Sequence, residues 1–450
     1  MGSIYWMGVS QEGERTMRAV LWRRSFALLL AAGLISSFGD LVVGIALPFY
    51  VYDLTHSVLA TGAMFIASTL PGLVVGSVAG VFVDRWDRKR TMVVADLTRV
   101  ALMLLLLAVR SRDTIWIVYL VAFVESSVSK FFEPAKSALI PRLVEARQLT
   151  AANALSRVSG NVISVVAPTA GGALLVLGGL PGVVLVDSVS FLVSGLLIAL
   201  IAVPTATREG VGIGLASAGT PTQAWVAVWR EWLEGLRLMR TASALVALFA
   251  VTGLAMLGQG FLTALNVVFV KTVLHGDARV FGWMVTVAGI GGLVGGVIVG
   301  HIGPRIPPAH LVTLGFAAAG VILVVRGNVP SLPLFLALTG LAPVFLTGLG
   351  VSLQTLLQGS VPDRYRGRVF GAFGTTNALL LLVGLGLGST LGGRVGVVAM
   401  LDVAGLLFIS ASGISFFLLP AAFSADVPSP PHAISIPHET STVMSESDAR

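Results

Sequence analysis

Long apolar segments separated by short polar loops dominate this sequence. About 20 residues are needed for a helix to cross the hydrocarbon core of a bilayer. By this measure the pattern predicts about twelve membrane-spanning helices, at 25–52, 58–83, 91–110, 114–136, 150–178, 183–204, 243–271, 279–301, 309–327, 331–357, 368–393 and 395–420. A longer polar connection separates the sixth span from the seventh, so the spans divide six and six.

The composition also indicates a membrane protein. The chain has 450 residues, of which 55% are hydrophobic and 11% charged, and its mean hydropathy is +0.91. Soluble proteins are about a quarter charged, so this chain has too few charges for a surface that faces water. The net charge of +7 comes from small loop clusters, which favours orientation in a membrane over a nucleic-acid partner. The absence of cysteine excludes disulfides, cysteine-ligated zinc and thiol catalysis.

The loops predict the orientation of the chain, because short cytoplasmic loops collect Lys and Arg. Loops 53–57 and 178–182 follow odd-numbered spans and contain neither residue. Loops 84–90, 141–147 and 362–368 follow even-numbered spans and are basic. Both termini are therefore expected in the cytoplasm, and the protein in the cell membrane, which in a bacterium is the inner membrane.

The pattern divides the chain into five segments. They are a cytoplasmic N-terminal segment (1–24), a six-helix bundle (25–204), a cytoplasmic linker (205–242), a second six-helix bundle (243–423) and a tail (424–450). The tail is rich in Ser and Pro and is expected to be disordered. Within the linker, apolar residues recur at helical spacing over 224–240 and predict an amphipathic helix at the lipid headgroups. The alternative is a soluble helix packed on another loop.

The two bundles show weak internal similarity. A shift of 221 residues pairs Pro141 with Pro362, Ala151 with Ala372, and Gly171 and Gly172 with Gly392 and Gly393. Two parallel six-helix repeats are the architecture of alternating-access transporters. The predicted fold class is therefore an all-α integral membrane protein of two parallel pseudo-repeat bundles.

The loop after the second span carries a specific motif, "GVFVDRWDRKR" at 80–90. It resembles the signature loop of the major facilitator superfamily, and the residues concerned are Gly80, Asp84, Arg85, Asp87, Arg88, Lys89 and Arg90. The counterpart at 296–307 keeps the glycines but has Gly300 in place of an aspartate. The resemblance covers about residues 20–423 and implies a transporter with the major facilitator fold.

The fifth span carries a second motif, "GNVISVVAPTAGG" at 160–172. Its residues Ala167, Pro168, Gly171 and Gly172 resemble an element associated with exporters, with Ala167 in place of the usual glycine. Pro168 is expected to kink the helix, and the glycines permit close helix contact. Together with 36–40, 131–144 and 151–155, the motif is most similar to the macrolide-efflux and enterobactin-exporter-like branch.

The resemblance implies that the signature loop clips the two halves together when the cavity opens outward. Asp84 is then expected near the start of the eleventh helix, where the positive end of the helix dipole favours a carboxylate. Arg85, Arg88 and Arg90 are expected to hold Asp84 and Asp87 and to meet anionic lipid. The alternative, a positive-inside anchor, explains the arginines but not the aspartates.

Charges within the spans are costly unless paired or solvated, and mark functional sites by default. They are concentrated in the first half, whereas the second half has essentially Asp402. A charge network among helices three, four and five is predicted for Asp96, Arg99, Lys130 and Arg157, mainly in a structural or gating role. Asp187 and Asp402 lie near expected helix ends and are interpreted as interfacial.

Asp40 and Glu125 are the candidates for proton coupling. A carboxylate in a low-dielectric cavity binds a proton more readily, because desolvation disfavours its charged form. Two alternatives remain open. Asp40 caps a local turn after Gly39, or Glu125 is neutralised by Lys130 or Arg157 as a structural pair.

Uncharged polar and aromatic residues supply candidates for a substrate cavity, although most such residues only pack or bridge helices. The candidates are Phe131, Asn161, Gln259, Asn266 and Gln354. An aromatic cavity with few polar groups suits bulky amphipathic compounds better than sugars, which need many hydrogen bonds.

The sequence contains no phosphate-binding loop, zinc-protease motif or nucleophile elbow. We therefore expect no enzyme activity, no cofactor and no metal. The function expected is that of a monomeric proton antiporter, which exports hydrophobic or amphipathic, drug- or macrolide-like molecules. The alternatives are a dedicated siderophore or lysolipid exporter, a passive facilitator and, in another class, a membrane sensor that transports nothing.

Overall fold

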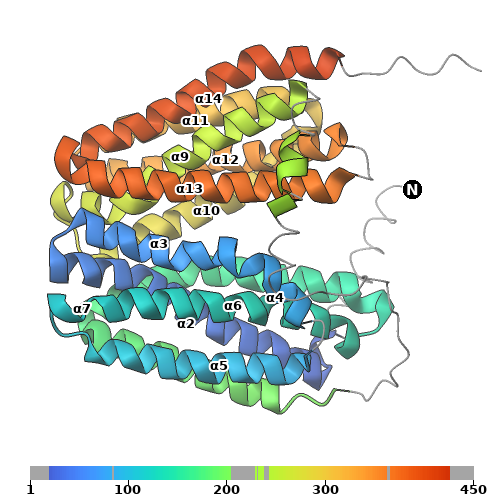
Figure 1. Cartoon of the computed structure of the whole chain (residues 1–450), viewed down its shortest axis with the longest axis vertical. Helices are drawn as coiled ribbons and strands as arrows, with labels where there is room; N and C mark the ends of the chain where they lie inside the picture. Colours follow the sequence, from blue (N-terminus) through green and yellow to red (C-terminus); the bar gives the residue numbers. More distant parts are fainter. Residues whose placement is uncertain are drawn as a thin grey trace, which may run out of the picture.

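All regular structure that the computed structural model describes is helical (Figure 1). The described residues are 20–83, 86–203, 229–230, 232–237, 243–361 and 365–425. The first half contains α2 (Arg24–Thr55), α3 (Val58–Val74), α4 (Gly76–Val83), α5 (Arg88–Leu105), α6 (Trp116–Leu143) and α7 (Leu149–Ala199). The second half contains α9 (Ser243–Thr272), α10 (Ala278–Ile302), α11 (Pro308–Gly327), α12 (Leu332–Ser360), α13 (Arg366–Val395) and α14 (Val397–Ala425). Four single turns connect them, η1 (Leu106–Ala108), η2 (Arg112–Thr114), η3 (Ala146–Gln148) and η4 (Gly303–Arg305).

Two of the predicted spans have an unexpected form. The second span is broken at Val75 into α3 and α4, four residues after Pro71, which lies inside α3. The fifth and sixth spans form the continuous α7, which turns sharply at Gly179 with φ 59° and ψ −168°. Glycine adopts this backbone conformation without the penalty that a Cβ brings. With α3 and α4 as one crossing and α7 as two, the described chain follows the twelve predicted crossings.

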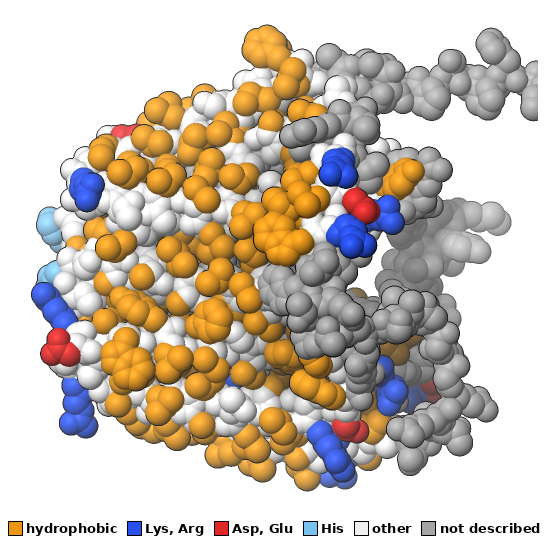
Figure 2. All heavy atoms as spheres, in the orientation of Figure 1, with side chains coloured by type: hydrophobic (Ala, Val, Ile, Leu, Met, Phe, Trp, Pro, Cys, Tyr) orange, Lys and Arg blue, Asp and Glu red, His pale blue; other side chains and the backbone are white. Residues whose placement is uncertain are grey.

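The outer surface of the bundle is suited to lipid. Ten of the described helices are long and apolar enough to span a membrane. On the face shown in Figure 2, hydrophobic side chains cover the middle of the molecule, and most charged side chains lie towards its two ends. Val94 and Leu97 of α5 are among the exposed large side chains. Because hydrocarbon offers no hydrogen bonds, helices that satisfy their own backbone groups are the form expected there.

The two halves lie side by side and meet through α7 with α10 and α3 with α13. Small residues permit this approach. A Cβ at Gly282 of α10 would overlap the carbonyl oxygen of Pro168, and one at Gly62 of α3 would overlap the side chain of Ser389. We call the end of the molecule where α2 begins and α14 ends the terminal end, and the opposite end the distal end. The α3–α13 contact lies towards the distal end, because Gly62 is near the start of α3 and Ser389 near the end of α13.

The halves separate towards the terminal end (Figure 1). Among the described residues, no atom would lie within 4 Å of a Cβ added at Gly296 or Gly300, in the last part of α10. The same holds for Gly367, Gly371 and Gly374, in the first part of α13. At these glycines, α10 and α13 therefore make no close contact of the kind that their distal parts make with the first half.

The linker contributes a short helical piece that packs on the second half. Nε1 of Trp232 donates a hydrogen bond to Oγ1 of Thr376 on α13 at 3.3 Å, and Glu234 pairs with Arg368 at 3.3 Å. Trp232 and Leu236 pack against the hydrophobic core of the second half. In the described part of the predicted amphipathic helix, these two apolar residues therefore contact protein. Residues 1–19, the rest of the linker and the predicted tail after Ala425 lie outside the described residues.

The contact between α7 and α10 makes a direct prediction for stability. Gly282→Ala places a Cβ against the backbone of Pro168 and should destabilise the protein by about 1–3 kcal/mol, as overpacking does. Gly296→Ala on the same helix adds its Cβ to open space, and should be neutral or stabilising because alanine favours helix by about 1 kcal/mol over glycine. Thermal unfolding of the two purified variants tests the difference, and equal unfolding temperatures would contradict the close contact.

Candidate functional site

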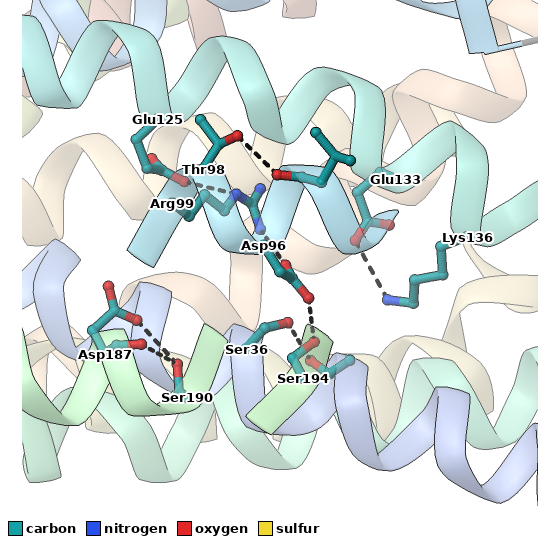
Figure 3. A network of polar contacts seen from close by, with 12 residues as sticks. Ser36, Asp96, Thr98, Arg99, Glu125, Glu133, Lys136, Asp187, Ser190 and Ser194 are labelled. Carbon is teal, nitrogen blue, oxygen red and sulfur yellow. Dashed lines mark hydrogen bonds and ion pairs between the residues drawn. The ribbon is translucent and has the colours of Figure 1, made fainter. Parts of the chain in front are cut away.

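The centre of the site is Arg99, a cation of α5 whose side chain is 2% exposed (Figure 3). Its Nε lies 3.5 Å from Oε1 of Glu125 on α6, and its Nη1 lies 3.7 Å from Oδ1 of Asp96 on α5. Its guanidinium also lies 5.2 Å from the ring centroid of Phe132 and 5.0 Å from that of Phe191. Such ring contacts contribute about 2 kcal/mol when the cation is desolvated. Arg99 therefore joins α5, α6 and the second part of α7.

Asp96 is fully buried and ties this group to the sixth crossing. Oγ of Ser194 on α7 donates a hydrogen bond to its Oδ2 at 2.6 Å. Its Oδ1 and the Nε of Arg99 have no hydrogen-bond partner among the described residues. The guanidinium is thus attracted by two carboxylates without a close hydrogen bond from Nε to either. A small movement of Arg99 is enough to favour one carboxylate over the other.

A cavity of about 240 Å³ brings together carboxylates from three helices. Asp40 comes from α2, Glu125 from α6 and Asp187 from α7. The rest of the lining is Val43, Met103, Ser126 and Ser129. Asp40 makes no hydrogen bond to another described residue, and α2 continues as a helix past it, so no turn is capped there. The two coupling candidates from the sequence therefore share one cavity.

Asp187 is a member of this group that the sequence interpretation missed. The expected span began at 183 and placed Asp187 near its outer end, but the helix starts immediately after Gly179, about 12 Å away along its axis. Asp187 is 1% exposed and accepts a hydrogen bond from Oγ of Ser190 at 3.2 Å. Its carboxylate occupies the space that a Cβ at Gly39 would need. The interfacial interpretation is wrong for Asp187. Two features of the sequence are consistent with a buried Asp187. Gly39 leaves room for its carboxylate on α2, and the short loop at 178–182 lets the helix begin well before residue 187.

Two members of the predicted charge network lie outside it. No described carboxylate comes within 4.0 Å of the Lys130 amino group or the Arg157 guanidinium, and Arg157 is exposed on α7. The residue within ion-pair distance of Glu125 is Arg99, so the alternative of a close structural pair between Glu125 and Lys130 or Arg157 is not the arrangement observed. The observed network joins helices three, four and six rather than three, four and five.

The predicted exporter motif lies at the contact between the halves. Ala167, Pro168, Gly171 and Gly172 are all buried. A Cβ at Gly171 would come within 2.8 Å of the carbonyl oxygen of Val42 on α2, and a Cβ at Gly172 would overlap that of Ala278 on α10. The two glycines therefore let α7 approach a helix of each half.

Asp277 fixes the start of α10 beside this motif. Its Oδ1 accepts the backbone N–H of Arg279 at 2.9 Å, and its Oδ2 pairs with the Arg279 side chain. Burial raises the pKa of Asp277, but the hydrogen bonds from Arg279 and the backbone outweigh burial and hold the pKa below its ordinary value. The carboxylate therefore stays ionised and caps the helix at the point where Gly172 packs.

The described part of the signature loop anchors α5. Asp87 is its N-cap and accepts the backbone N–H of Arg90 at 2.8 Å. Arg88 donates to the carbonyl of Ala138 and Lys89 to that of Ile201, at 3.1 and 2.8 Å. Gly80 lies in α4, whereas Asp84, Arg85 and residues 362–364 lie outside the described residues, so the predicted contact of Asp84 with the eleventh helix stays a prediction.

The substrate-cavity candidates are scattered. Phe131 stacks on Trp86 beside the signature loop, with ring centroids 5.8 Å apart. Asn266 accepts a hydrogen bond from Arg326, and Gln259 lies near Thr263 on its own helix, α9. Asn161 of α7 and Gln354 of α12 are exposed. The described residues thus provide no common pocket for the five.

Arg326 is a buried charge of the second half, for which the sequence analysis named only Asp402. It is 6% exposed in the last turn of α11, where the helix dipole favours a cation. It donates hydrogen bonds to Oδ1 of Asn266 at 3.1 Å and Oγ1 of Thr339 at 3.3 Å, and lies 5.1 Å from the ring centroid of Phe335. Arg326 therefore links α9, α11 and α12, and Asn266 serves this link.

An ion pair joins the two halves at the distal end. Nζ of Lys271, in the last turn of α9, lies 2.7 Å from Oδ1 of Asp53, in the last turn of α2. The same ammonium lies 5.6 Å from the ring centroid of Phe49, which in turn contacts Phe281 of α10 at 5.4 Å. The distal end is therefore closed by charge and by aromatic packing.

Comparison with known proteins assigns this architecture. A family model described as "Transmembrane secretion effector" matches residues 16–443. The chain belongs to this family. It is a membrane transporter of the major facilitator superfamily, in the efflux branch, which confirms the resemblance of its two motifs.

Named relatives and solved structures agree with this assignment. Macrolide efflux protein A of Streptococcus pyogenes is 26% identical over 396 residues, covering 86% of this chain and 94% of the relative. Enterobactin exporter EntS of Escherichia coli is 26% identical over 400 residues, covering 85% and 88%. The structure of a bacterial homologue of the iron transporter ferroportin, in an inward-facing state, matches with a TM-score of 0.69 at 17% identity, covering 87% of this chain and 98% of that one. That structural likeness shows the fold alone.

The buried pair in this transporter predicts an energetic coupling. Arg99→Gln leaves Asp96 buried without its cation and should cost about 3–5 kcal/mol of stability. The double variant Asp96→Asn with Arg99→Gln should recover part of this loss, because both groups are then neutral. Arg157→Gln, on the exposed face of α7, should change stability by no more than about 0.5 kcal/mol. Thermal unfolding measures all three, and a double variant no more stable than Arg99→Gln alone would contradict the coupling.

The distal ion pair predicts a conformational effect. Asp53→Lys places two cations at the contact and should open the distal end. Because the chain has no cysteine, Ser389→Cys, at a side chain 2% exposed beside Gly62, gives a clean reporter. Labelling by a membrane-impermeant maleimide should rise in Asp53→Lys and fall again in the swapped pair Asp53→Lys with Lys271→Asp. If labelling does not rise, the ion pair does not hold the distal end closed.

Proposed function

We propose that this transporter exports hydrophobic or amphipathic small molecules in exchange for protons. The observation that carries the proposal is the cavity shared by Asp40, Glu125 and Asp187 beside Arg99. A proton-coupled exporter needs a group that takes a proton on one side of the membrane and releases it on the other. Three carboxylates in one cavity of a membrane-embedded bundle have the chemistry for this task.

The balance of charge in the cavity supports the binding of a proton. The groups that act electrostatically on Asp40 and Glu125 are Arg99, Lys130, Lys136, Asp96, Asp187 and Glu133. Together with Asp40 and Glu125 themselves, these groups make five carboxylates and three cations, and Glu133 and Lys136 pair with each other at 3.3 Å. Like charges in a low-dielectric site repel strongly, so ionising every carboxylate is unfavourable. Binding a proton, or a cation, relieves this repulsion.

The position of Arg99 provides a route from protonation to movement. When Glu125 is ionised, the guanidinium is shared between Glu125 and Asp96, at 3.5 and 3.7 Å. A proton on Glu125 removes one of the two attractions, so Arg99 shifts towards Asp96. Because Arg99 also packs on Phe132 and Phe191, that shift alters the packing of α6 against α7. Protonation is thereby linked to helix packing beside the cavity.

Alternating access supplies the transport cycle. We place both termini in the cytoplasm, because the basic loops lie at the terminal end. The distal end, closed by Lys271 and Asp53, then faces outward, and the open terminal end faces the cytoplasm. In the opposite state the distal contact breaks, and the signature loop, with Asp84 at the start of α13, holds the terminal end closed. The transporter acts in this scheme as a monomer in the bacterial plasma membrane.

Three alternatives make different predictions for flux. The chain exports one dedicated siderophore or lysolipid, acts as a passive facilitator, or is a membrane sensor that transports nothing. A dedicated exporter shows gradient-driven flux of one compound from a broad panel. A facilitator shows saturable flux that needs no gradient, whereas a sensor shows no flux after reconstitution.

Everted membrane vesicles with an acidic interior test the proposal. One coupled proton contributes about tenfold accumulation per pH unit, because each unit is worth about 1.4 kcal/mol. Wild-type vesicles should therefore accumulate a dye or macrolide. At least one of the single variants Asp40→Asn and Glu125→Gln should lose about this factor of accumulation while remaining folded and inserted. The variant Asp187→Asn extends the test to the third carboxylate. Asp113→Asn, in the exposed turn η2, is the matched control and should pump normally. If all three cavity variants also pump normally, the cavity does not couple protons.

A further inference from the structure

A second cavity lies outside the carboxylate group, between α5 and α6. We call it the α5–α6 groove. It has a volume of about 540 Å³ and is lined by Trp86, Asp87, Arg90, Thr91, Val94, Ala95, Thr98, Val128 and Phe131. Its residues on α5 run from Asp87 to Thr98, a length of about 16 Å. Val94, which is 61% exposed, belongs to the apolar surface of the bundle, so the groove opens towards lipid.

One end of the groove is basic. The side chain of Arg90 is exposed and has no carboxylate within 4.0 Å among the described residues. Asp87 lies beside it, but its carboxylate is engaged with the backbone N–H of Arg90 as the N-cap of α5. Arg88 and Lys89 add positive charge at the same turn, and so does the positive end of the α5 dipole. This end of the groove favours an anion.

The rest of the groove is apolar although it includes two threonines. Oγ1 of Thr91 donates a hydrogen bond to the carbonyl of Asp87 at 2.9 Å, and Oγ1 of Thr98 to that of Val94 at 2.8 Å. Both hydroxyl groups are thus satisfied by their own helix, which removes their need for a polar partner in the groove. Val94, Ala95 and Val128 continue the apolar wall. This length of the groove matches a hydrocarbon chain.

An aromatic pair lines the groove near its basic end. Trp86 and Phe131 stack with ring centroids 5.8 Å apart and an interplanar angle of 23°. Trp86 is 50% exposed, and tryptophan is enriched where a protein meets the lipid headgroups. This placement sets the basic end at headgroup level and the apolar length within the hydrocarbon. It also explains why Phe131, expected in a substrate cavity, lies beside the signature loop.

We propose that the α5–α6 groove binds an anionic phospholipid from the leaflet at the terminal end. The phosphate lies at Arg90 and the start of α5, and one acyl chain lies along α5 towards Thr98. Charge complementarity selects the headgroup, because the Arg90 guanidinium at the mouth attracts an anion and repels a cationic ligand. The apolar length selects an attached chain over a small soluble anion. This site is separate from the carboxylate cavity and does not depend on the transported substrate.

Quenching of Trp86 fluorescence tests the proposal. The full chain is placed in nanodiscs of phosphatidylcholine that contain, at equal mole fraction, either brominated phosphatidylglycerol or brominated phosphatidylcholine. The chain has eight tryptophans, so the Trp86 signal is taken as the difference between the wild type and Trp86→Phe, which keeps an aromatic ring. Brominated phosphatidylglycerol should quench Trp86 with about fivefold higher apparent affinity, the preference that one arginine near the surface gives an anionic lipid.

Substitutions of Arg90 locate the headgroup. Arg90→Gln should abolish the preference for phosphatidylglycerol, and Arg90→Lys should retain it. Arg142→Gln is the matched control, because Arg142 is also exposed at the terminal end, in the last turn of α6, but does not line the groove. The preference should remain in that variant.

Three outcomes would overturn the proposal. Equal quenching by the two brominated lipids would show that the groove does not select an anion. An equal loss of preference in Arg90→Gln and Arg142→Gln would show general attraction to a charged surface. Release of brominated phosphatidylglycerol by soluble glycerol phosphate would show an anion site that does not require the acyl chain.

Discussion

A cation buried within a membrane-embedded bundle must be neutralised by its neighbours, and this constraint organises the first half. Arg99 meets it with two carboxylates, from α5 and α6, and with the faces of two phenylalanines. An isolated buried charge costs several kcal/mol, so helices that supply these groups must stay together. One of these neighbours, Glu125, also lines the cavity that holds Asp40 and Asp187. Stability and candidate chemistry therefore depend on one guanidinium.

The two halves of the molecule divide their tasks unequally. The first half holds a cluster of buried carboxylates, whereas Arg326 in the second half is satisfied by an amide, a hydroxyl and a ring. The contact between the halves depends on close backbone approach at Gly172 and Gly282 and on a distal ion pair. An interface of small residues offers little side-chain interlocking. This suits a contact that closes at one end while the other opens, and it leaves the charge chemistry within one bundle.

The lipid-facing surface has chemistry of its own. The turn that begins α5 carries the signature motif, and its Arg90 and Trp86 also line the α5–α6 groove. Asp87 and Lys89 tie the same turn to the start of α5 and to the end of the sixth crossing. A single loop thus links the membrane surface, the packing of α5 and the terminal end where the halves separate.

The sequence by itself determined the crossings, the efflux family and both candidate carboxylates, because hydrophobic length, loop charge and short motifs are local properties of the chain. It did not determine the partners of the buried charges. Lys130 and Arg157 are as close in sequence to Glu125 as Arg99 is, or nearly so, but only packing decides which side chain faces it. Asp187 was missed for the same reason, since the sharp turn at Gly179 and the absence of a side chain at Gly39 bring its carboxylate to Asp40. Helix ends and helix rotations fix such contacts, and both are set by how the helices pack in three dimensions.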